Sequence, residues 1–495
     1  MAGSYTAVVS VILAFYCVSA KESIVGCYYG TWATYRNGLG KFDVSNINVD
    51  LCTHLFYTFV GISNNGNVIS LDPYLDLPDN WGRDNFRKFN ALKEKNPNLK
   101  TILAVGGWNE GSAKYSVMAA NPTLRRNFVT SALNFVKSYG FDGLDVDWEY
   151  PNRRDSVNGQ ADIDNFTQLL KELRAEFDKD NLLLSSAVAS VKDVASLSYD
   201  IPAILQYLDI ISLMAYDMYG PWDSVTGHNA PLHKGEGDEN TPKESVYSVD
   251  VALEFWLSQG CPPEKLLLGL PLYGHTFKLR NASVNGVRSP INGPGIAGPY
   301  TATNGQIGYN EFCNKIRTET WDLRYDNLAK VPYAVQGTNW VSYDDENSLV
   351  EKIEYALNLN IGGVMIWSIE TDDFHGICHS VDFPLLRAVN RAVGRSPPSP
   401  SSSTSVTPTT SYPNISDTTT STIISSSTAE TTEHPSVCKE EGLTANPKDC
   451  SSFYMCVRSV DGFAYFIQYC PSNLYWDQDK KICNYPDSVQ CEAKN

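Results

Sequence analysis

Eight short apolar runs recur between residues 21 and 394 and alternate with segments of helical periodicity. Near-continuous apolar strands separated by helices predict a parallel sheet that is covered on both faces. Eight such units predict an α/β fold of the closed (β/α)8 barrel type rather than an open sheet. The runs are SIVGCYYG, CTHLFYTFVGI, TILAVGGW, FDGLDVDWE, LLLSSAVA, LDIISLMAYD, KLLLGLPLYG and IGGVMIWSIE. One helical face is formed by Phe166, Leu169, Leu170, Leu173 and Phe177.

The region is longer than a plain barrel, which has roughly 250 residues. Its longest interval lies between Tyr273 and the last apolar run, is rich in Gly, Asn and Pro, and contains Cys313. We therefore predict an insertion at about residues 275–340.

Two other stretches have a biased composition. Residues 1–20 carry no charged side chain and contain AVVSVILAF followed by VSA, as a secretory signal peptide does. A membrane anchor is the alternative, but the apolar run is short for a bilayer span of ~20 residues. Residues 395–435 consist mainly of Ser, Thr and Pro and predict an O-glycosylated linker. The predicted order is signal peptide (1–20), large domain (21–394), linker (395–435) and tail domain (436–495), with no membrane partner.

Charge and cysteine content narrow the class of protein. The net charge is −17 and no cluster of Lys or Arg stands out, so a nucleic-acid partner is not expected. Twelve cysteines suit an oxidising compartment, and five of them in the large domain leave one thiol unpaired. Six crowd the tail and predict a small disulfide-held domain: Cys438, Cys450, Cys456, Cys470, Cys483 and Cys491.

No metal site is expected from the sequence. There is no CxxC pair, and HGICH at residues 375–379 lacks the glutamate of an HExxH motif. Three N-x-S/T sequons mark predicted glycosylation sites at Asn165, Asn281 and Asn414.

The fourth apolar run carries an unusual set of acids, in FDGLDVDWEYP. Side chains alternate faces along a strand, so Asp145, Asp147 and Glu149 share one face, which points inward in a barrel. Such close carboxyls are expected to titrate as a coupled set and to keep Glu149, nearest the mouth, protonated as a general acid. Binding of a divalent cation and a solvated edge strand are the alternatives.

Polar and aromatic residues collect at the carboxyl ends of the predicted strands, where barrels carry their chemistry. They include Tyr28, Gly106 to Asn109, Asp145 to Glu149, Tyr216, Asp217, Tyr273 and Trp367. This clustering predicts an active site before any family is considered.

FDGLDVDWEYP resembles the DxxDxDxE signature of glycoside hydrolase family 18, and LAVGGW, MAYD and GGVMIWSIETDDF resemble its other motifs. The layout resembles an arthropod-type chitinase with an inserted α+β domain. The resemblance implies substrate-assisted retaining hydrolysis that needs no cofactor. It implies Glu149 as acid and base, Asp147 as the group that orients the substrate's acetamide, and Asp145 as its proton-sharing partner. Tyr216 would donate to the acetamide oxygen, Asp217 would bind substrate, and Asp142 would support the carboxyls from behind.

The same resemblance implies a set of sugar contacts: Tyr28, Trp32, Phe59, Gly106, Gly107, Trp108, Asn109, Tyr150, Met214, Trp222, Tyr273 and Trp367. Trp367 would stack beneath the sugar next to the cleaved bond, and Trp108 and Trp222 would lie on the leaving-group side. It also implies disulfides Cys27–Cys52 and Cys313–Cys378, leaving Cys261 as the odd, buried thiol. One departure is His275 in PLYGHTF, where the family often has Arg.

The tail spacing C-x11-C-x5-C-x13-C-x12-C-x7-C resembles a peritrophin-A type chitin-binding module. Small disulfide domains bury little, so some tail aromatics are expected to be exposed for sugar stacking. We predict Tyr475 and Trp476 as contacts. A disulfide cap or a protein-binding module is the alternative.

Together these features predict a secreted, monomeric, endo-acting chitinase that hydrolyses β-1,4 links of N-acetylglucosamine polymers, with chitin or chito-oligosaccharides as its partners. The alternatives are a catalytically silent chitin-binding lectin or growth-factor-like protein, an endo-N-acetylglucosaminidase, and a structural matrix protein.

Overall fold

The computed structural model describes residues 22–397 and, in the tail, residues 442–447, 449–459, 462–469, 475–478, 482–484 and 489. The chain divides into two compact units, residues 1–404 and 405–495. The predicted signal peptide, Asn414, Cys438, Cys470, Cys491 and all but the first three residues of the predicted linker lie outside the described residues.

The first unit contains a closed ring of eight parallel strands, which confirms the predicted barrel. The order around the ring is β1-β15-β8-β7-β6-β5-β4-β2, and pairing of β1 with β2 closes it. Each predicted apolar run supplies one strand, and nearly every position of these strands is buried. They are β1 (Ile24–Gly30), β2 (His54–Ile62), β4 (Lys100–Gly106), β5 (Gly143–Asp147), β6 (Leu183–Ala189), β7 (Ile210–Met214), β8 (Leu266–Pro271) and β15 (Gly363–Trp367).

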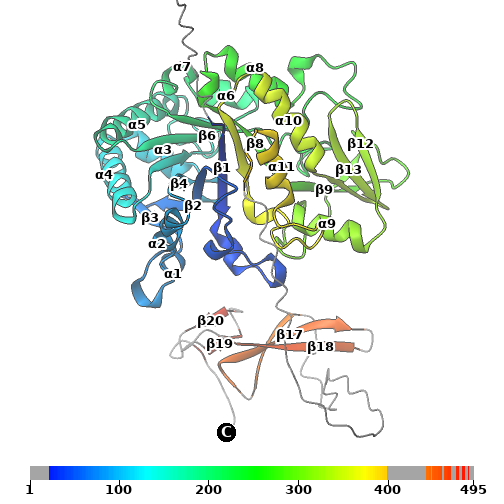
Figure 1. The fold of residues 1–495 in the computed structure, drawn as a ribbon. Helices are drawn as coiled ribbons and strands as arrows, with labels where there is room; N and C mark the ends of the chain where they lie inside the picture. Colours follow the sequence, from blue (N-terminus) through cyan, green and yellow to red (C-terminus); the bar gives the residue numbers. More distant parts are fainter. Residues whose placement is uncertain are drawn as a thin grey trace, which may run out of the picture. The chain divides into compact units, whose positions relative to one another are not determined.

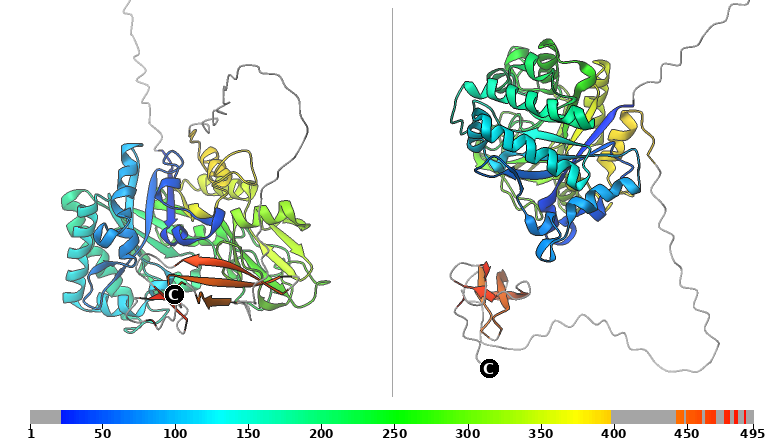
Figure 2. Two further views of the ribbon diagram at one scale, coloured as in Figure 1. Left: turned by 90° about the horizontal axis from the view of Figure 1, so that it is seen from below. Right: turned by 90° about the vertical axis from the view of Figure 1, so that its left-hand side faces the viewer.

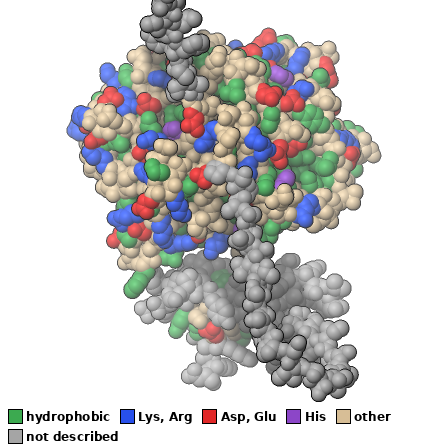
Figure 3. All heavy atoms as spheres, viewed as in Figure 1, with side chains coloured by type: hydrophobic (Ala, Val, Ile, Leu, Met, Phe, Trp, Pro, Cys, Tyr) green, Lys and Arg blue, Asp and Glu red, His purple; other side chains and the backbone are tan. Residues whose placement is uncertain are grey.

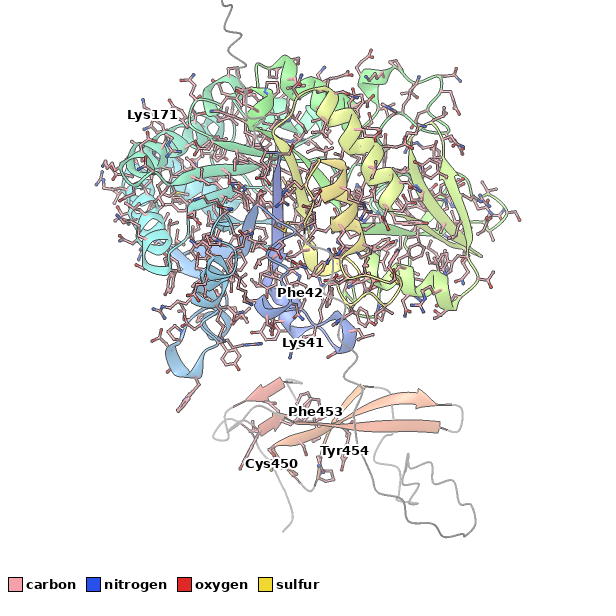
Figure 4. The ribbon with its side chains drawn as sticks, viewed as in Figure 1. Lys41, Phe42, Lys171, Cys450, Phe453 and Tyr454 are labelled. Carbon is pink, nitrogen blue, oxygen red and sulfur yellow. A yellow bond between two sulfur atoms is a disulfide. The ribbon has the colours of Figure 1, made fainter. Side chains whose placement is uncertain are left out.

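Helices cover the outside of the ring, as Figures 1 and 2 show. The predicted face of α5 is the buried one, whereas Lys171 on the same helix is exposed and points outward (Figure 4). The helices are α1 (Pro73–Asp76), α2 (Asn85–Asn90), α3 (Ala113–Ala120), α4 (Pro122–Tyr139), α5 (Ala161–Phe177), α6 (Lys192–Ser198), α7 (Ile201–Ile204), α8 (Val249–Ser258), α10 (Glu346–Asn358) and α11 (Pro384–Ala392). None of the described helices is both long and apolar enough to span a membrane.

An α+β insertion with its own sheet lies beside the ring, as expected (Figure 1). The sheet has the order β10-β9-β14-β13-β12, with β11 paired to β9. One face packs around Phe277 and Trp340, and the other buries Phe312 of helix α9 against Tyr343. Its elements are β9 (Tyr273–Leu279), β10 (Ile291–Pro294), β11 (Gln306–Gly308), α9 (Tyr309–Thr318), β12 (Asp322–Asp326), β13 (Val331–Gln336) and β14 (Asn339–Ser342). The short strand β3 (Val68–Ser70) pairs antiparallel with the end of β2, outside the ring.

Covalent and ionic links join distant parts of this unit. Disulfides connect Cys27 to Cys52 and Cys313 to Cys378, the two pairs that the resemblance implies. Cys261 is a buried free thiol. The two ends of the barrel chain also meet, because Arg395 Nε lies 2.8 Å from Glu22 Oε1.

The second unit has two small antiparallel sheets: β16 (Gly442–Ala445), β17 (Ser452–Ser459) and β18 (Gly462–Tyr469), and β19 (Tyr475–Asp477) with β20 (Ile482–Asn484). Trp476 stacks on Phe453 of β17, with ring centroids 3.9 Å apart (Phe453 is labelled in Figure 4). Trp476 is 5% exposed, so it belongs to the core of this unit. This burial does not fit the sugar contact predicted for Trp476. Tyr475 is only partly buried.

Candidate active site

The acids of β5 divide by parity as the pattern predicts. Leu144, Val146 and Trp148 pack into the outer core, where the Trp148 ring meets Phe166 of α5 edge-on at 5.7 Å. The Trp148 indole N–H also donates to Ser112 Oγ at 2.6 Å. The carboxyls of Asp145 and Asp147 therefore occupy the opposite, inner face of the ring.

Asp145 is fully buried and well supplied with donors. The hydroxyl of Tyr28 donates to its Oδ2 at 2.9 Å, and the hydroxyl of Ser185 donates to its Oδ1 at 2.6 Å. Burial nevertheless raises the pKa of Asp145 to about 6. One donor thus comes from the neighbouring strand β6 and the other from β1, which does not pair with β5, and together they fix the orientation of this carboxyl.

Asp147 is buried but incompletely bonded. Its Oδ1 atom has no hydrogen-bond partner among the described residues. Burial, followed by the charges of Glu149 and Asp145, raises the pKa of Asp147 well above its ordinary value. A buried, unpaired carboxyl oxygen is costly unless something else binds it, so Asp147 is open to a ligand's donor.

Glu149 follows the end of β5 and is partly buried. Burial is the largest cause that raises its pKa, to about 7, and the charge of Asp217 adds to the effect. A hydrogen bond with Tyr150 and the charge of Arg154 act in the opposite direction. The expectation that crowding among the three acids keeps Glu149 protonated is therefore only partly right, because burial is the largest cause and the leading charge that adds to it is that of Asp217 rather than of Asp145 or Asp147.

Asp142 lies apart from this group. Its carboxyl accepts hydrogen bonds from Lys93 Nζ at 2.9 Å and from the Thr101 backbone N–H at 2.9 Å. These contacts hold the start of β5 against β4 and give Asp142 a structural task.

Two glycines let β4 approach the acids. A Cβ atom on Gly106 would lie 2.0 Å from the Asp147 carbonyl oxygen, and one on Gly107 would lie 2.6 Å from the Phe59 ring. Both have positive φ angles, of 117° and 84°. Larger residues at these two positions would clash and be strained, which explains the GG pair.

Aromatic rings surround the inner acids on one side. Trp367 at the end of β15 stacks near Phe59 at 5.8 Å and lies 6.1 Å from Trp32, measured between ring centroids. Tyr28, which holds Asp145, meets Trp367 edge-on at 5.8 Å. Trp32 is 43% exposed, so this set runs from the buried acids to solvent.

A second set gathers around Asp217, just after β7. Asp217 Oδ1 accepts from the Tyr273 hydroxyl at 2.5 Å and lies 2.7 Å from His275 Nε2. The His275 ring contacts the largely exposed Trp222 edge-on at 5.0 Å. Tyr216 packs beside Tyr273 and donates weakly to Met365 Sδ at 3.7 Å, and Met214 lies in the same buried cluster. His275, the departure from the family pattern, is thus a partner of Asp217.

Trp108 and Asn109, which follow β4, are exposed. The guanidinium carbon of Arg154 lies 3.8 Å from the centroid of the Trp108 ring, and Arg154 Nη1 donates to the Trp108 carbonyl oxygen at 2.6 Å. Tyr150 is partly buried and packs against the inner cluster.

Sequence reasoning missed three residues of this arrangement. Ser185 was visible only as one of two serines in an apolar strand. Arg154 stands five positions after Glu149 in a loop. Asn229 lies in a loop that carries no recognisable motif. Each acquires its place through tertiary contacts. Of the two described glycosylation candidates, Asn281 is exposed and Asn165 is partly buried on α5.

The described residues contain one group spaced to hold a metal ion, namely Cys313, Asp373 and Cys378. Its two cysteines are joined in a disulfide, so they are not thiolate ligands. The arrangement around β5 offers an acid with a raised pKa, an unpartnered carboxyl oxygen and nearby aromatic rings. This combination suits acid-catalysed cleavage of a sugar linkage.

Comparison with known proteins agrees with this geometry. Residues 24–372 match the family model for glycosyl hydrolases family 18, and residues 438–491 match the chitin-binding peritrophin-A domain. "Probable chitinase 2" of Drosophila melanogaster is 41% identical over 401 residues, covering 75% of this chain and 80% of that protein.

Two solved structures share the barrel. The Ostrinia furnacalis Group IV chitinase is 56% identical with a TM-score of 0.74, over 76% of this chain and 100% of that one. Human YKL-39, described as a pseudo-chitinase with retained chitooligosaccharide binding properties, is 38% identical with a TM-score of 0.69, over 75% of this chain and 100% of that one. With its acidic strand inside an eight-stranded barrel and a family match over most of its length, the chain belongs to the glycosyl hydrolases of family 18 and carries a C-terminal peritrophin-A domain.

Proposed function

We propose that this protein is a secreted, endo-acting chitinase that hydrolyses β-1,4 linkages of N-acetylglucosamine polymers. The observation that carries the proposal is the placement of Glu149, with a pKa of about 7, two residues beyond Asp147 at the end of the buried strand β5. A carboxyl with that pKa holds a proton at neutral pH in much of the population and can deliver it to a leaving oxygen.

The proposed reaction uses the substrate as its own nucleophile. The carbonyl oxygen of the substrate's acetamide bonds to the anomeric carbon, the glycosidic C–O bond breaks, and the leaving oxygen takes the proton of Glu149. Water then attacks the same carbon and returns a proton to Glu149 as the oxazolinium ring opens. The protein must therefore hold the acetamide close to the anomeric carbon.

Asp147 is suited to hold that acetamide. Its buried, unpartnered Oδ1 fits the acetamide N–H, and its charge would stabilise the positive oxazolinium. Asp145, fixed by Tyr28 and Ser185, would share a proton with Asp147 when that carboxyl turns. Tyr216 would donate to the acetamide oxygen, and Asp217 would accept from a sugar hydroxyl.

The aromatic rings supply the sugar contacts of the proposal. Trp367 would stack beneath the sugar next to the cleaved bond, and Trp32 would stack on a sugar farther along the glycone. Trp108 and Trp222 would lie on the leaving-group side. Trp108 and Trp222 are 56% and 62% exposed, so each has a ring face free for stacking. The Tyr28, Phe59, Tyr150, Met214 and Tyr273 side chains would complete the walls, together with Gly106, Gly107 and Asn109.

The tail and the predicted signal peptide would bring the enzyme to its substrate. The tail would attach the monomeric enzyme to solid chitin through aromatics such as the partly buried Tyr475, and this attachment would raise the local substrate concentration. On the face of the first unit shown in Figure 3, acidic and basic side chains are interspersed. Removal of residues 1–20 would accompany secretion.

A catalytically silent binding protein on the same barrel is the main alternative, since YKL-39 is described as such a relative. The acidic residue at position 149 favours an enzyme, because a lectin needs no proton donor there. The match to a chitin-binding domain favours chitin over glycoprotein glycans as the substrate and disfavours an endo-N-acetylglucosaminidase.

The test is turnover of a chito-oligosaccharide by the full chain and by Glu149→Gln. We expect the variant to lose at least about 10³-fold in kcat while it still binds the oligomer. Equal turnover by both proteins would remove the assigned acid, and no turnover by the unaltered protein would favour the binding-protein alternative.

A further inference from the structure

The segment that follows β7 is fastened to the inserted sheet along its length. The Thr226 backbone N–H donates to Ser289 at 2.8 Å, and the Leu232 N–H donates to Ala329 at 2.8 Å. Between them, His228 Nε2 lies 3.0 Å from Asp326 Oδ2 at the end of β12. The segment begins with Asp217, so the inserted domain anchors the loop that carries this acid.

Asn229 lies at the centre of this attachment and is completely buried. Its Oδ1 accepts from the Asp217 backbone N–H at 2.8 Å, and its Nδ2 donates to the Tyr273 carbonyl oxygen at 3.1 Å. Its own backbone N–H donates to Ser342 Oγ of β14 at 2.8 Å, and its carbonyl accepts from Met218 at 3.0 Å. One residue therefore joins the end of β7, the start of β9 and the inserted sheet.

Asp217 needs such support because its backbone is left-handed, with φ of 54°. A non-glycine residue in that region is strained unless its surroundings hold it there. The hydrogen bond from Asp217 N–H to Asn229 stabilises this conformation. The same asparagine fixes the backbone of Tyr273, whose hydroxyl donates to Asp217 Oδ1. The carboxylate and one of its two donors are thus oriented through Asn229.

We propose that Asn229 is a positioning residue through which the inserted domain fixes the carboxylate of Asp217 toward the substrate. The contact between Asp217 and the substrate rests on the proposed function, whereas the orientation of the Asp217 backbone does not. The two parts are therefore tested by separate measurements.

The first measurement is amide hydrogen exchange of the peptide that contains Asp217, followed by mass spectrometry on the full chain without substrate. We expect Asn229→Ala to speed exchange of this peptide at least about tenfold, because the Asp217 N–H loses its acceptor. Asn390→Ala is the matched control. Asn390 lies on α11, far along the chain from Asp217, and it is as buried as Asn229. Its side-chain amide donates to the carbonyl oxygens of Leu51 and Leu386. This control should leave the Asp217 peptide protected. Unchanged protection in Asn229→Ala would overturn the proposal even if the protein hydrolysed no chitin.

The second measurement is a double-mutant cycle on kcat/KM for a soluble chito-oligosaccharide. Asn229→Ala should lower kcat/KM about 100-fold in the unaltered chain but less than about threefold in an Asp217→Ala background. A purely structural asparagine would give the same loss in both backgrounds, which would contradict the proposal.

A milder variant guards against misfolding. Ser342→Ala removes only the acceptor of the Asn229 backbone N–H, and we expect a loss of about fivefold in kcat/KM that again disappears in the Asp217→Ala background. Additive losses for this variant would count against the proposal as well.

Discussion

Arg154 lies over the ring of Trp108, with its guanidinium carbon 3.8 Å from the ring centroid and its Nη1 atom donating to the Trp108 carbonyl oxygen at 2.6 Å. The cation covers one face of an indole that is otherwise 56% exposed. The arginine thus limits the orientations of Trp108 and leaves the opposite ring face for a sugar.

We predict that Arg154→Ala weakens binding of a chito-oligosaccharide about fivefold, because Trp108 loses its stacked partner. The dissociation constant would be measured by calorimetry in the Glu149→Gln background, where turnover is blocked. Arg153→Ala is the matched control, since Arg153 is its exposed neighbour in the same loop. Equal affinity of the Arg154 and Arg153 variants would show that the stacked arginine does not organise this contact.

The pH dependence of kcat/KM should show a basic limb near pH 7, where Glu149 loses its proton. Because the charge of Arg154 lowers the pKa of Glu149, Arg154→Ala should move this limb to higher pH. Rates measured from pH 4 to 9 on a soluble oligomer would test both points. A basic limb that stays in place in the variant would argue against electrostatic control by Arg154.

Glu149→Gln should also stabilise the fold at high pH. The folded protein holds the proton of Glu149 up to about pH 7, whereas the unfolded chain releases it near its ordinary pKa of 4.5. Stability from this group therefore falls as the pH rises from about 4.5 to about 7 and stays low above that range. At about 1.4 kcal/mol per pKa unit, the variant should gain up to roughly 3 kcal/mol at pH 8 relative to pH 4.

Urea unfolding of both proteins at the two pH values would measure this gain. Glu94→Gln, at an exposed position on the first unit, should give the same difference from the unaltered protein at both pH values. If Glu149→Gln behaves like that control, the carboxyl is not destabilised in the folded state.

Deletion of residues 395–495 should spare hydrolysis of soluble chito-oligosaccharides and reduce the rate on solid chitin roughly tenfold or more, since the tether would be lost. Initial rates on both substrates at equal enzyme concentration would show this difference. A parallel loss on both would mean that the tail supports the barrel itself rather than its attachment to the polymer.

The sequence predicted the ring well because each strand of a parallel barrel is a nearly uninterrupted apolar run, and such runs are readable without tertiary knowledge. It also predicted which β5 residues face inward, since a strand alternates faces with a fixed period. The source of the raised Glu149 pKa was harder to predict, because it depends chiefly on how completely the folded chain excludes water from this carboxyl.

The contacts that escaped prediction all join distant segments. Ser185 on β6 donates to Asp145 on the adjacent strand β5. Asn229 lies in a loop without periodicity, and its backbone N–H donates to Ser342 of the inserted sheet. Trp476 was expected on the surface, but its stacking on Phe453 depends on how the small sheets of the tail meet. Local pattern carries no information about such pairings.

The ion pair between Glu22 and Arg395 has a consequence for the connectivity of the first unit. β1 pairs with β15, so the strand that opens the barrel lies next to the one that completes it. A short peptide bridging residues 22 and 395 would allow new termini to be cut in an exposed loop elsewhere while every pairing around the ring is preserved. The order in which the strands are synthesised is therefore separable from the order in which they stand side by side.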